Sequence, residues 1–198
     1  RLKEKKISRD ALPAYITRSL SLILGPNFAK EFGLQKLPAD KEAEIAKYKA
    51  LAAPTALARA DASSGRKVYQ TICSACHVMY GEGGKIGPEL TGSNRADLNY
   101  LLLNILYPSD DIADSYKMVT IATKDGRTLA GNVSEEDKQK VVLNMIGQKI
   151  TIPKSDIKSR AISDFSMMPA GLLQTLQHDE VVALFKYMQT KQQVPLSK

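Results

Sequence analysis

The apolar positions of the chain follow a helical period towards both ends and a strand period in between. Spacings of three and four residues predict helices over residues 14–24, 41–51, 66–73, about 97–106 and roughly 178–191. Asp61, Ser63 or Ser64 can cap the third of these helices, and Pro108 ends the fourth. Residues 52–62 are rich in alanine, which predicts a linker or a loosely packed helix.

Apolar and polar residues alternate in short runs over residues 116–152. This pattern predicts three or four antiparallel strands, with Asp125-Gly126 at one hairpin turn. After Pro153 we expect short helical pieces up to the last helix. Residues 79–92 are rich in glycine and predict a loop between the third and fourth helices.

The composition is that of a soluble globular protein, with 43% hydrophobic and 25% charged residues in 198. This length suits one domain, with or without an extension. No apolar run approaches the roughly 20 residues that span a bilayer, so no transmembrane segment is expected. The charged start, residues 1–6, is not followed by an apolar stretch, so we expect no signal peptide within this sequence.

The positive charge is concentrated at the start of the chain. Residues 1–60 carry 12 Lys and Arg against 6 Asp and Glu, which is +6 of the net +7. Lys and Glu alternate there and the chain has no Trp, whereas nucleic-acid binders combine a basic stripe with stacking aromatic side chains. We therefore expect no nucleic-acid partner. The basic segment is expected to be a solvated spacer, with the steering of an acidic partner or membrane surface as the alternative.

Both cysteines of the chain lie in the motif Cys73-Ser74-Ala75-Cys76-His77. A zinc site needs a second pair of ligands, and a thioredoxin-type redox pair follows a strand rather than a helix. Histidine directly after the second cysteine is typical of c-type haem attachment, because two thiols three positions apart can each add to a haem vinyl group. The motif therefore favours covalent haem, with a disulfide or a metal-binding pair as the alternative.

Further motifs resemble those of class I cytochrome c. They are a helix with Gly65 and Tyr69, the haem motif, Gly87-Pro88-Glu89-Leu90, a late Met-Pro and a last helix with Tyr187. Asp125-Gly126-Arg127, Gly131 and Ser166-Met167-Met168-Pro169-Ala170-Gly171-Leu172 resemble the planctomycete/verrucomicrobium-type haem-binding domain. The two resemblances together cover about residues 63–190.

The resemblance implies a mainly α fold: the class I cytochrome c helical fold with a small antiparallel β-sheet insertion at about residues 116–152 and an N-terminal helical extension. It places the cytochrome c domain at residues 62–198. Residues 1–61, a basic helical extension or linker, match no known domain. The strand insertion is expected either to cover the haem edge or to dock a partner.

The resemblance also implies roles for single residues. Cys73 and Cys76 would form the thioethers, and His77 would be the proximal iron ligand. The Pro88 carbonyl would accept a hydrogen bond from the second ring nitrogen of His77, which fixes the imidazole and raises its basicity. Gly65 and Tyr69 would meet Tyr187 where the first and last helices of the domain cross.

The second axial iron ligand has several candidates. Met168 is favoured, because Pro169 biases it to an extended conformation that suits a side chain reaching across a pocket. Met167, His178 or an open position are the alternatives. Met79 is expected on the proximal side of the haem, and Met118, Met145 and Met188 are expected in the core.

His/Met ligation leaves no free position for a substrate, so we expect an electron-transfer protein with one covalent haem c, not an enzyme. Its partner would be a redox protein, possibly a dehydrogenase. Covalent haem attachment indicates the periplasm or another exported compartment. A haem-based ligand sensor and a docking module of a dehydrogenase complex are the alternatives, and the sequence indicates no oligomeric state.

Overall fold

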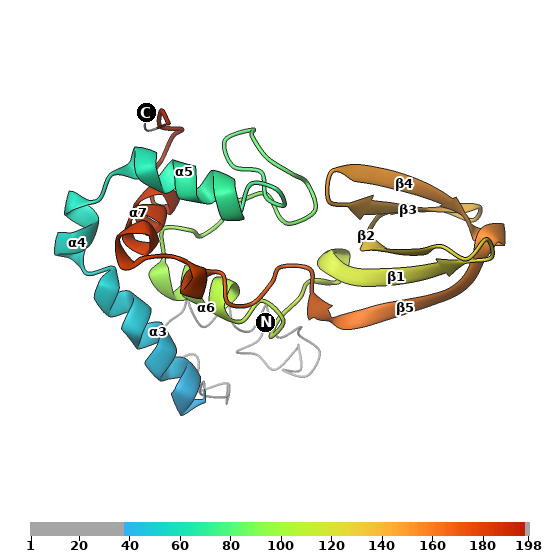
Figure 1. The fold of residues 1–198 in the computed structure, drawn as a ribbon, viewed down its shortest axis with the longest axis horizontal. Helices are drawn as coiled ribbons and strands as arrows, with labels where there is room; N and C mark the ends of the chain where they lie inside the picture. The colour runs from blue at the N-terminus through green and yellow to red at the C-terminus, as the bar shows by residue number, and fades with distance from the viewer. Residues whose placement is uncertain (1–37, 197–198) are drawn as a thin grey trace, which may run out of the picture. The chain divides into compact units, whose positions relative to one another are not determined.

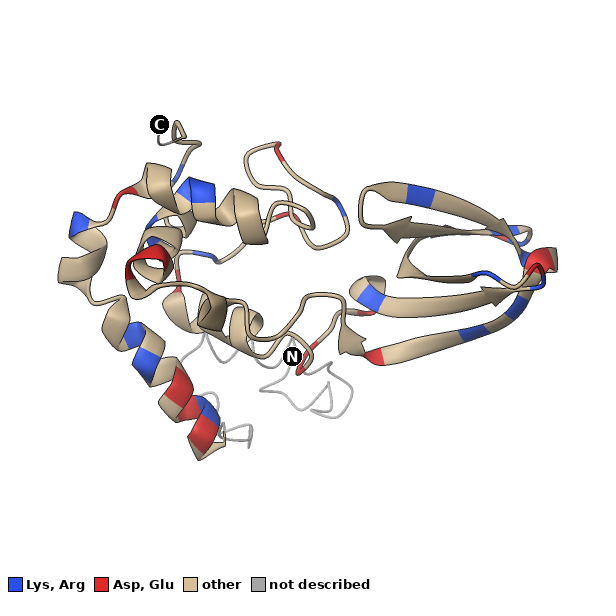
Figure 2. Ribbon diagram, viewed as in Figure 1, with Lys and Arg blue, Asp and Glu red and all other residues tan. Residues whose placement is uncertain are grey.

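The computed structural model describes residues 38–196 (Figure 1). The chain divides into two compact units, residues 1–46 and residues 47–198. Helix α3 (Ala39–Leu51) confirms the helix predicted over residues 41–51, and acidic and basic residues are mixed along it (Figure 2). The helix predicted over residues 14–24 lies outside the described residues, as does most of the predicted basic extension. The domain boundary at residue 61 stays a prediction.

Four further α-helices belong to the second unit: α4 (Pro54–Arg59), α5 (Ala62–Ile72), α6 (Leu98–Leu106) and α7 (His178–Met188). Short 3-10 turns lie at η2 (Asp114–Tyr116), η3 (Lys154–Asp156) and η4 (Leu173–Thr175). Helices α5, α6 and α7 confirm the helices predicted near residues 66–73, 97–106 and 178–191, and α4 lies where a linker or a loosely packed helix was expected. Among the residues that the structure describes, no helix is both long and apolar enough to cross a membrane.

Side-chain caps explain where α5 and α6 begin. The Asp61 carboxylate accepts hydrogen bonds from the backbone N–H groups of Ser63 and Ser64, at 3.1 and 2.9 Å. Asp97 does the same for Asn99 and Tyr100 at the start of α6. These bonds satisfy donors that the first helical turn leaves without a partner. Both helix starts are therefore determined by nearby residues. Because Cys73–His77 follows directly after α5, the start of that helix also helps to determine where this motif lies.

Helices α5 and α7 cross at a glycine. A β-carbon on Gly65 would lie 1.9 Å from the carbonyl oxygen of Ala183, so only glycine permits this approach of the two backbones. Beside the crossing, the rings of Tyr69 and Tyr187 pack with their centroids 5.4 Å apart. This confirms the expected meeting of Gly65, Tyr69 and Tyr187. Helix α4 also packs against α7.

Five strands form an antiparallel sheet in the order β4-β3-β2-β1-β5. They are β1 (Lys117–Thr123), β2 (Thr128–Glu136), β3 (Lys140–Met145), β4 (Gln148–Pro153) and β5 (Ile157–Ser166). The first part of β2 pairs with β1 and its second part with β3, so that Gly131 lies opposite Val119 and Asn132 lies opposite Asn144.

The sheet has a core of its own. Five buried residues contributed by β1, β3 and β4 form it: Val119, Ile121, Val141, Leu143 and Ile152. In Figure 1 the sheet curls, so that β3 and β4 face β1 and β5. A buried apolar cluster of this kind is what the alternating pattern over residues 116–152 predicts for one face of the sheet.

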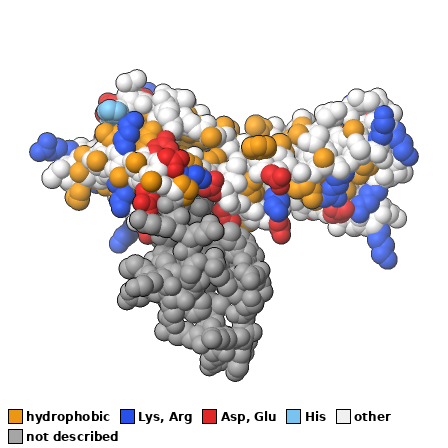
Figure 3. Space-filling model, turned by 90° about the horizontal axis from the view of Figure 1, so that it is seen from below, with side chains coloured by type: hydrophobic (Ala, Val, Ile, Leu, Met, Phe, Trp, Pro, Cys, Tyr) orange, Lys and Arg blue, Asp and Glu red, His pale blue; other side chains and the backbone are white. Residues whose placement is uncertain are grey.

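The prediction of a mainly α, class I cytochrome c helical fold is wrong. Helices hold 37% and strands 25% of the described residues, and the sheet has five strands. The prediction missed β5, where short helical pieces were expected after Pro153. Residues of β5 are mostly exposed, with Ile162 at 62% and Phe165 at 73%, so the strand shows no alternation of buried and exposed positions. Pairing with β1, not burial, defines this strand. Exposed apolar side chains are also seen elsewhere on the surface, as Figure 3 shows for one face.

Candidate functional site

The motif Cys73–His77 forms a tight turn at the carboxyl end of α5. Cys73 is the C-cap of that helix, and its N–H donates to Tyr69 O at 2.8 Å. The N–H groups of Cys76 and His77 both donate to Cys73 O, at 3.1 and 3.0 Å. Both cysteines are free thiols and half-buried. The turn therefore presents two thiols and an imidazole within five consecutive residues.

The environment of the thiols is unlike that of a redox-active cysteine pair. Burial, with a smaller contribution from Cys76, raises the pKa of Cys73 to about 12. Burial also raises the pKa of the Cys76 thiol. A thioredoxin-type pair has a lowered thiol pKa at a helix amino terminus, whereas this motif follows a helix carboxyl terminus. The geometry thus disfavours thiol–disulfide exchange.

The ring of His77 is held in one orientation. Its Nδ1 lies 2.8 Å from the carbonyl oxygen of Pro88. Because a carbonyl oxygen only accepts, Nδ1 carries a proton, which leaves Nε2 as the ring nitrogen that can ligate a metal. Burial lowers the pKa of His77, which outweighs the opposite effect of the hydrogen bond to Pro88. This shift favours the neutral form of the imidazole, the form that ligates a metal.

Glycine and tyrosine complete the setting of His77. A β-carbon on Gly87 would lie 2.5 Å from Cε1 of the His77 ring, so the ring rests directly on the backbone before Pro88. The Tyr69 hydroxyl donates to the His77 carbonyl oxygen at 2.8 Å. Because Tyr69 also packs on Tyr187, the helix crossing fixes the backbone of His77. Elements from both ends of the domain thus position this histidine.

The loop after the motif is joined to α7 by a buried arginine. The Arg95 guanidinium donates to Met188 O, to Thr190 O at 2.6 Å and to the Tyr80 hydroxyl at 2.8 Å. Its Nε donates to Leu90 O at 3.0 Å. Because one side chain satisfies carbonyls on the loop and at the end of α7, these segments are held together.

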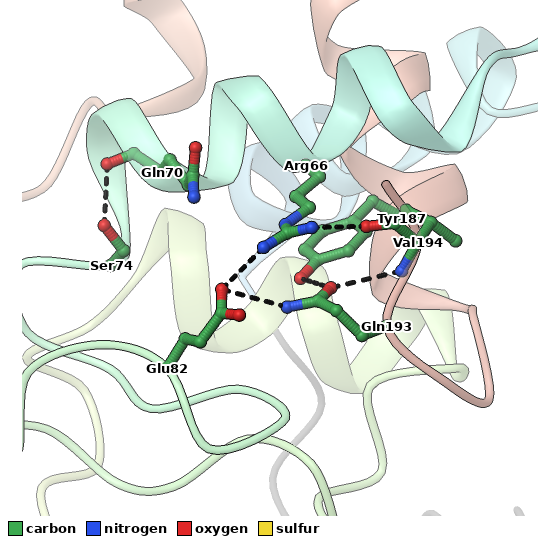
Figure 4. A network of polar contacts seen from close by, with 7 residues as sticks. All are labelled: Arg66, Gln70, Ser74, Glu82, Tyr187, Gln193 and Val194. Atoms are coloured by element: carbon green, nitrogen blue, oxygen red, sulfur yellow. Dashed lines mark hydrogen bonds and ion pairs between the residues drawn. The ribbon is translucent and has the colours of Figure 1, made fainter. Parts of the chain in front are cut away.

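A second polar network holds the segment after α7, as Figure 4 shows. Arg66 on α5 donates to Glu82 at 2.6 Å and to the Val194 carbonyl at 2.5 Å. Gln193 donates to Glu82 at 3.2 Å and accepts from the Tyr187 hydroxyl at 2.8 Å. The start of the glycine-rich loop is thereby connected to α5 and to the chain end that follows α7.

The methionines occupy different environments. Met79 is fully buried and Met188 is 4% exposed, which confirms the expected core role of Met188. Met145 is half-buried and packs against the sheet core. Met167 and Met168 follow β5 and are half-buried, and the Met168 N–H donates to the Ser166 hydroxyl at 3.1 Å. His178 is exposed at the start of α7.

The structure therefore brings together four of the five predicted site residues. Cys73, Cys76, His77 and Pro88 lie in one turn and the loop against it. Met168 belongs to a separate segment, which leads from β5 to η4 (Figure 1). The role of Met168 rests on its sequence context.

Sequence reasoning missed two buried asparagines on the sheet. Asn132 donates through Nδ2 to Ile86 O at 2.5 Å, and Asn144 donates to Lys85 O at 2.6 Å. The available signal was that each asparagine is flanked by apolar residues or glycine in a predicted strand, where a polar side chain needs a partner. Sequence reasoning also missed the buried Arg95, which lies in the loop before α6 and carries no such signal.

The residues present fit a covalently attached haem. The two free thiols have the spacing that thioether attachment needs, and the next residue is a histidine whose Nδ1 is bound to Pro88 O, which leaves Nε2 for a metal. The contact with Gly87 and the hydrogen bond to Pro88 are the supports expected around a metal-ligating histidine.

Comparison with known proteins agrees with this chemistry. Residues 60–188 match the family model described as cytochrome C oxidase, cbb3-type, subunit III. No curated protein gives a match to the chain. The matched region contains the haem motif, the glycine-rich loop, the sheet and α7. The chain belongs to this cytochrome c family and is a haem-binding electron-transfer cytochrome.

Proposed function

We propose that the chain is a mono-haem cytochrome c that exchanges single electrons with a partner redox enzyme, with His77 and Met168 as the axial ligands. The observation that carries this proposal is the His77 ring. It rests on Gly87 and donates from Nδ1 to Pro88 O at 2.8 Å, within a turn that also holds both cysteines.

Each residue of the site has a separate task. Cys73 and Cys76 hold the haem through thioethers, and Pro88 orients His77. His77 presents Nε2, and Met168 supplies a thioether sulfur from the segment after β5. A haem with histidine and methionine ligands supplies an iron that cycles between the ferrous and ferric states at a raised potential.

The setting proposed for this cytochrome is the periplasm or an equivalent exported compartment, where haem is attached covalently. Its partner is a redox protein, possibly a dehydrogenase. The motifs at residues 125–131 and 166–172 support a relation to the planctomycete/verrucomicrobium-type haem-binding domain. The chain has a single Cys-x-x-Cys-His motif, which supports one haem.

Haem staining of a denaturing gel tests covalent attachment. Protein made together with haem-maturation machinery should keep its haem through denaturation, and Cys73→Ala/Cys76→Ala should lose it. Ser74→Ala is a matched control, because it changes the same motif without touching a thiol; the Ser74 hydroxyl donates only locally to Gln70 O at 2.7 Å. Loss of stain from the unmodified protein on denaturation would refute the proposal.

A further inference from the structure

The sheet reaches the haem-motif loop through two asparagines on neighbouring strands. Asn132 on β2 and Asn144 on β3 lie directly opposite each other in the antiparallel register. Both are buried, at 4% and 9% exposure. Their side-chain amides donate to two successive backbone carbonyls, those of Ile86 at 2.5 Å and Lys85 at 2.6 Å. A cross-strand pair thus binds one short stretch of loop.

That stretch leads straight into the residues that orient His77. Gly87, on which the His77 ring rests, follows Ile86, and Pro88 supplies the carbonyl that accepts from Nδ1. On the other side, the Gly87 N–H donates to Cys76 O at 2.8 Å. The loop is therefore held between the haem motif and the sheet.

The stretch from Lys85 to Pro88 forms no helix or strand. Its carbonyls at Lys85 and Ile86 have the asparagine amides as partners. An asparagine in a buried strand position is costly, and here the Oδ1 of Asn132 is buried without a hydrogen-bond partner. A position that needs only packing would suit an apolar residue better, so the bond to Ile86 O has a specific task.

We infer that Asn132 and Asn144 are positioning residues for the proximal histidine. By holding the carbonyls of Lys85 and Ile86, they keep the Pro88 carbonyl against Nδ1 of His77. The strength of that hydrogen bond sets the basicity of the imidazole, and thereby the reduction potential of the iron. The sheet is then a functional part of the redox site. The inference rests on the proposed role of His77.

The test uses the full chain loaded with haem, as Asn132→Ala, Asn144→Ala and the double variant. A looser Pro88 carbonyl makes His77 a weaker donor, which stabilises the ferric state less. The potential is therefore expected to rise, most in the double variant. The Gly87 backbone N–H should exchange with solvent roughly tenfold faster, as expected when hydrogen bonds that hold its loop are lost.

Two controls separate positioning from general loosening. Asn104→Ala removes an amide that donates to Tyr100 O at 2.7 Å, an asparagine-to-carbonyl bond within helix α6 and not to the loop. Val141→Ala leaves a cavity in the apolar sheet core, a cluster that contains neither asparagine, and should lower the melting temperature. Both controls should leave the potential unchanged. A potential shift in Val141→Ala equal to that of the asparagine variants would overturn the inference.

An unchanged potential in both single variants, with haem still attached, overturns the positioning role alone. Absence of covalent haem from the unmodified protein would instead overturn the proposed function. Should Asn132→Ala fail to fold, the potential of Asn144→Ala or of the milder Asn144→Ser decides. Asn144 borders an open cleft of about 360 Å³, so shortening its side chain leaves no enclosed cavity.

Discussion

Gly65 and Ala183 bring helices α5 and α7 into backbone contact: a β-carbon on Gly65 would lie 1.9 Å from the Ala183 carbonyl oxygen. The obstacle is backbone, so no side-chain rotation relieves it. This contact also positions Tyr69 on α5, whose ring packs on Tyr187 and whose hydroxyl donates to the His77 carbonyl oxygen. The crossing of two helices far apart in the sequence thus reaches the proposed iron ligand.

Gly65→Ala is expected to force α5 and α7 apart and to lower the free energy of unfolding by about 3 kcal/mol. Urea unfolding followed by circular dichroism measures this. Gly92→Ala is the control, because no atom lies within 4 Å of a β-carbon there. If the Gly65→Ala protein were instead more stable by about 1 kcal/mol, as helix propensity alone predicts, the close approach of the two backbones at Gly65 would be refuted.

Gly87→Ala should disturb His77 without a large change in the rest of the fold. A β-carbon at Gly87 would lie 2.5 Å from Cε1 and 2.8 Å from Nδ1 of the ring, so the ring must move. We expect the free energy of unfolding to fall by about 1–3 kcal/mol and the reduction potential of the haem-loaded protein to change. Gly92→Ala again serves as the reference; equal potentials in the two variants would contradict the contact.

Met168→Ala should remove the proposed thioether ligand. The expected result is a lower reduction potential and an iron that binds added cyanide or imidazole, whereas Met167→Ala should leave both properties as they are. Visible absorption of the oxidised protein, with and without cyanide, measures this. The opposite outcome for the two variants would shift the ligand to Met167, and cyanide binding by the unmodified protein would favour a ligand sensor.

The Asp61 cap should make α5 sensitive to acid. Hydrogen bonds from the Ser64 hydroxyl, then from the N–H groups of Ser64 and Ser63, hold the pKa of Asp61 below its usual value of 3.8. The carboxylate therefore adds stability that is present above pH 3.8 and is lost as the pH falls through the lowered pKa.

Asp61→Ala should accordingly lower the melting temperature at neutral pH, with the difference from the unmodified protein shrinking in acid below about pH 3.8. Asp61→Asn keeps a capping oxygen and should lose less stability at neutral pH. A difference between Asp61→Ala and the unmodified protein that stays constant down to acid would show that the carboxylate charge plays no part.

A chain that begins at Ala62 is expected to bind haem with the same ligands and the same spectrum. Because α4 packs against α7, we also expect a lower melting temperature than for a chain that begins at Lys47. Thermal unfolding and visible spectra of the two shortened proteins test this. Failure of the Ala62 chain to fold, with success of the Lys47 chain, would place the domain boundary before α4.

Local features of the sequence were sufficient for the helices and for the attachment motif. The periods of α5, α6 and α7, the caps Asp61 and Asp97 and the spacing Cys73–His77 involve residues within a few positions of each other. Short-range geometry therefore determines them. The contact between His77 and Pro88 was also anticipated, but only through the resemblance to cytochrome c.

Tertiary structure alone decided the rest. Strand β5 is held by hydrogen bonds to β1 while most of its side chains are exposed, so its sequence shows no alternation of apolar and polar residues. Asn132 and Asn144 look like ordinary polar strand residues until the fold places the carbonyls of Ile86 and Lys85 against their amides. Such contacts join segments far apart in the chain. The flanking residues can therefore show that a buried asparagine needs a partner, but not which carbonyl it binds.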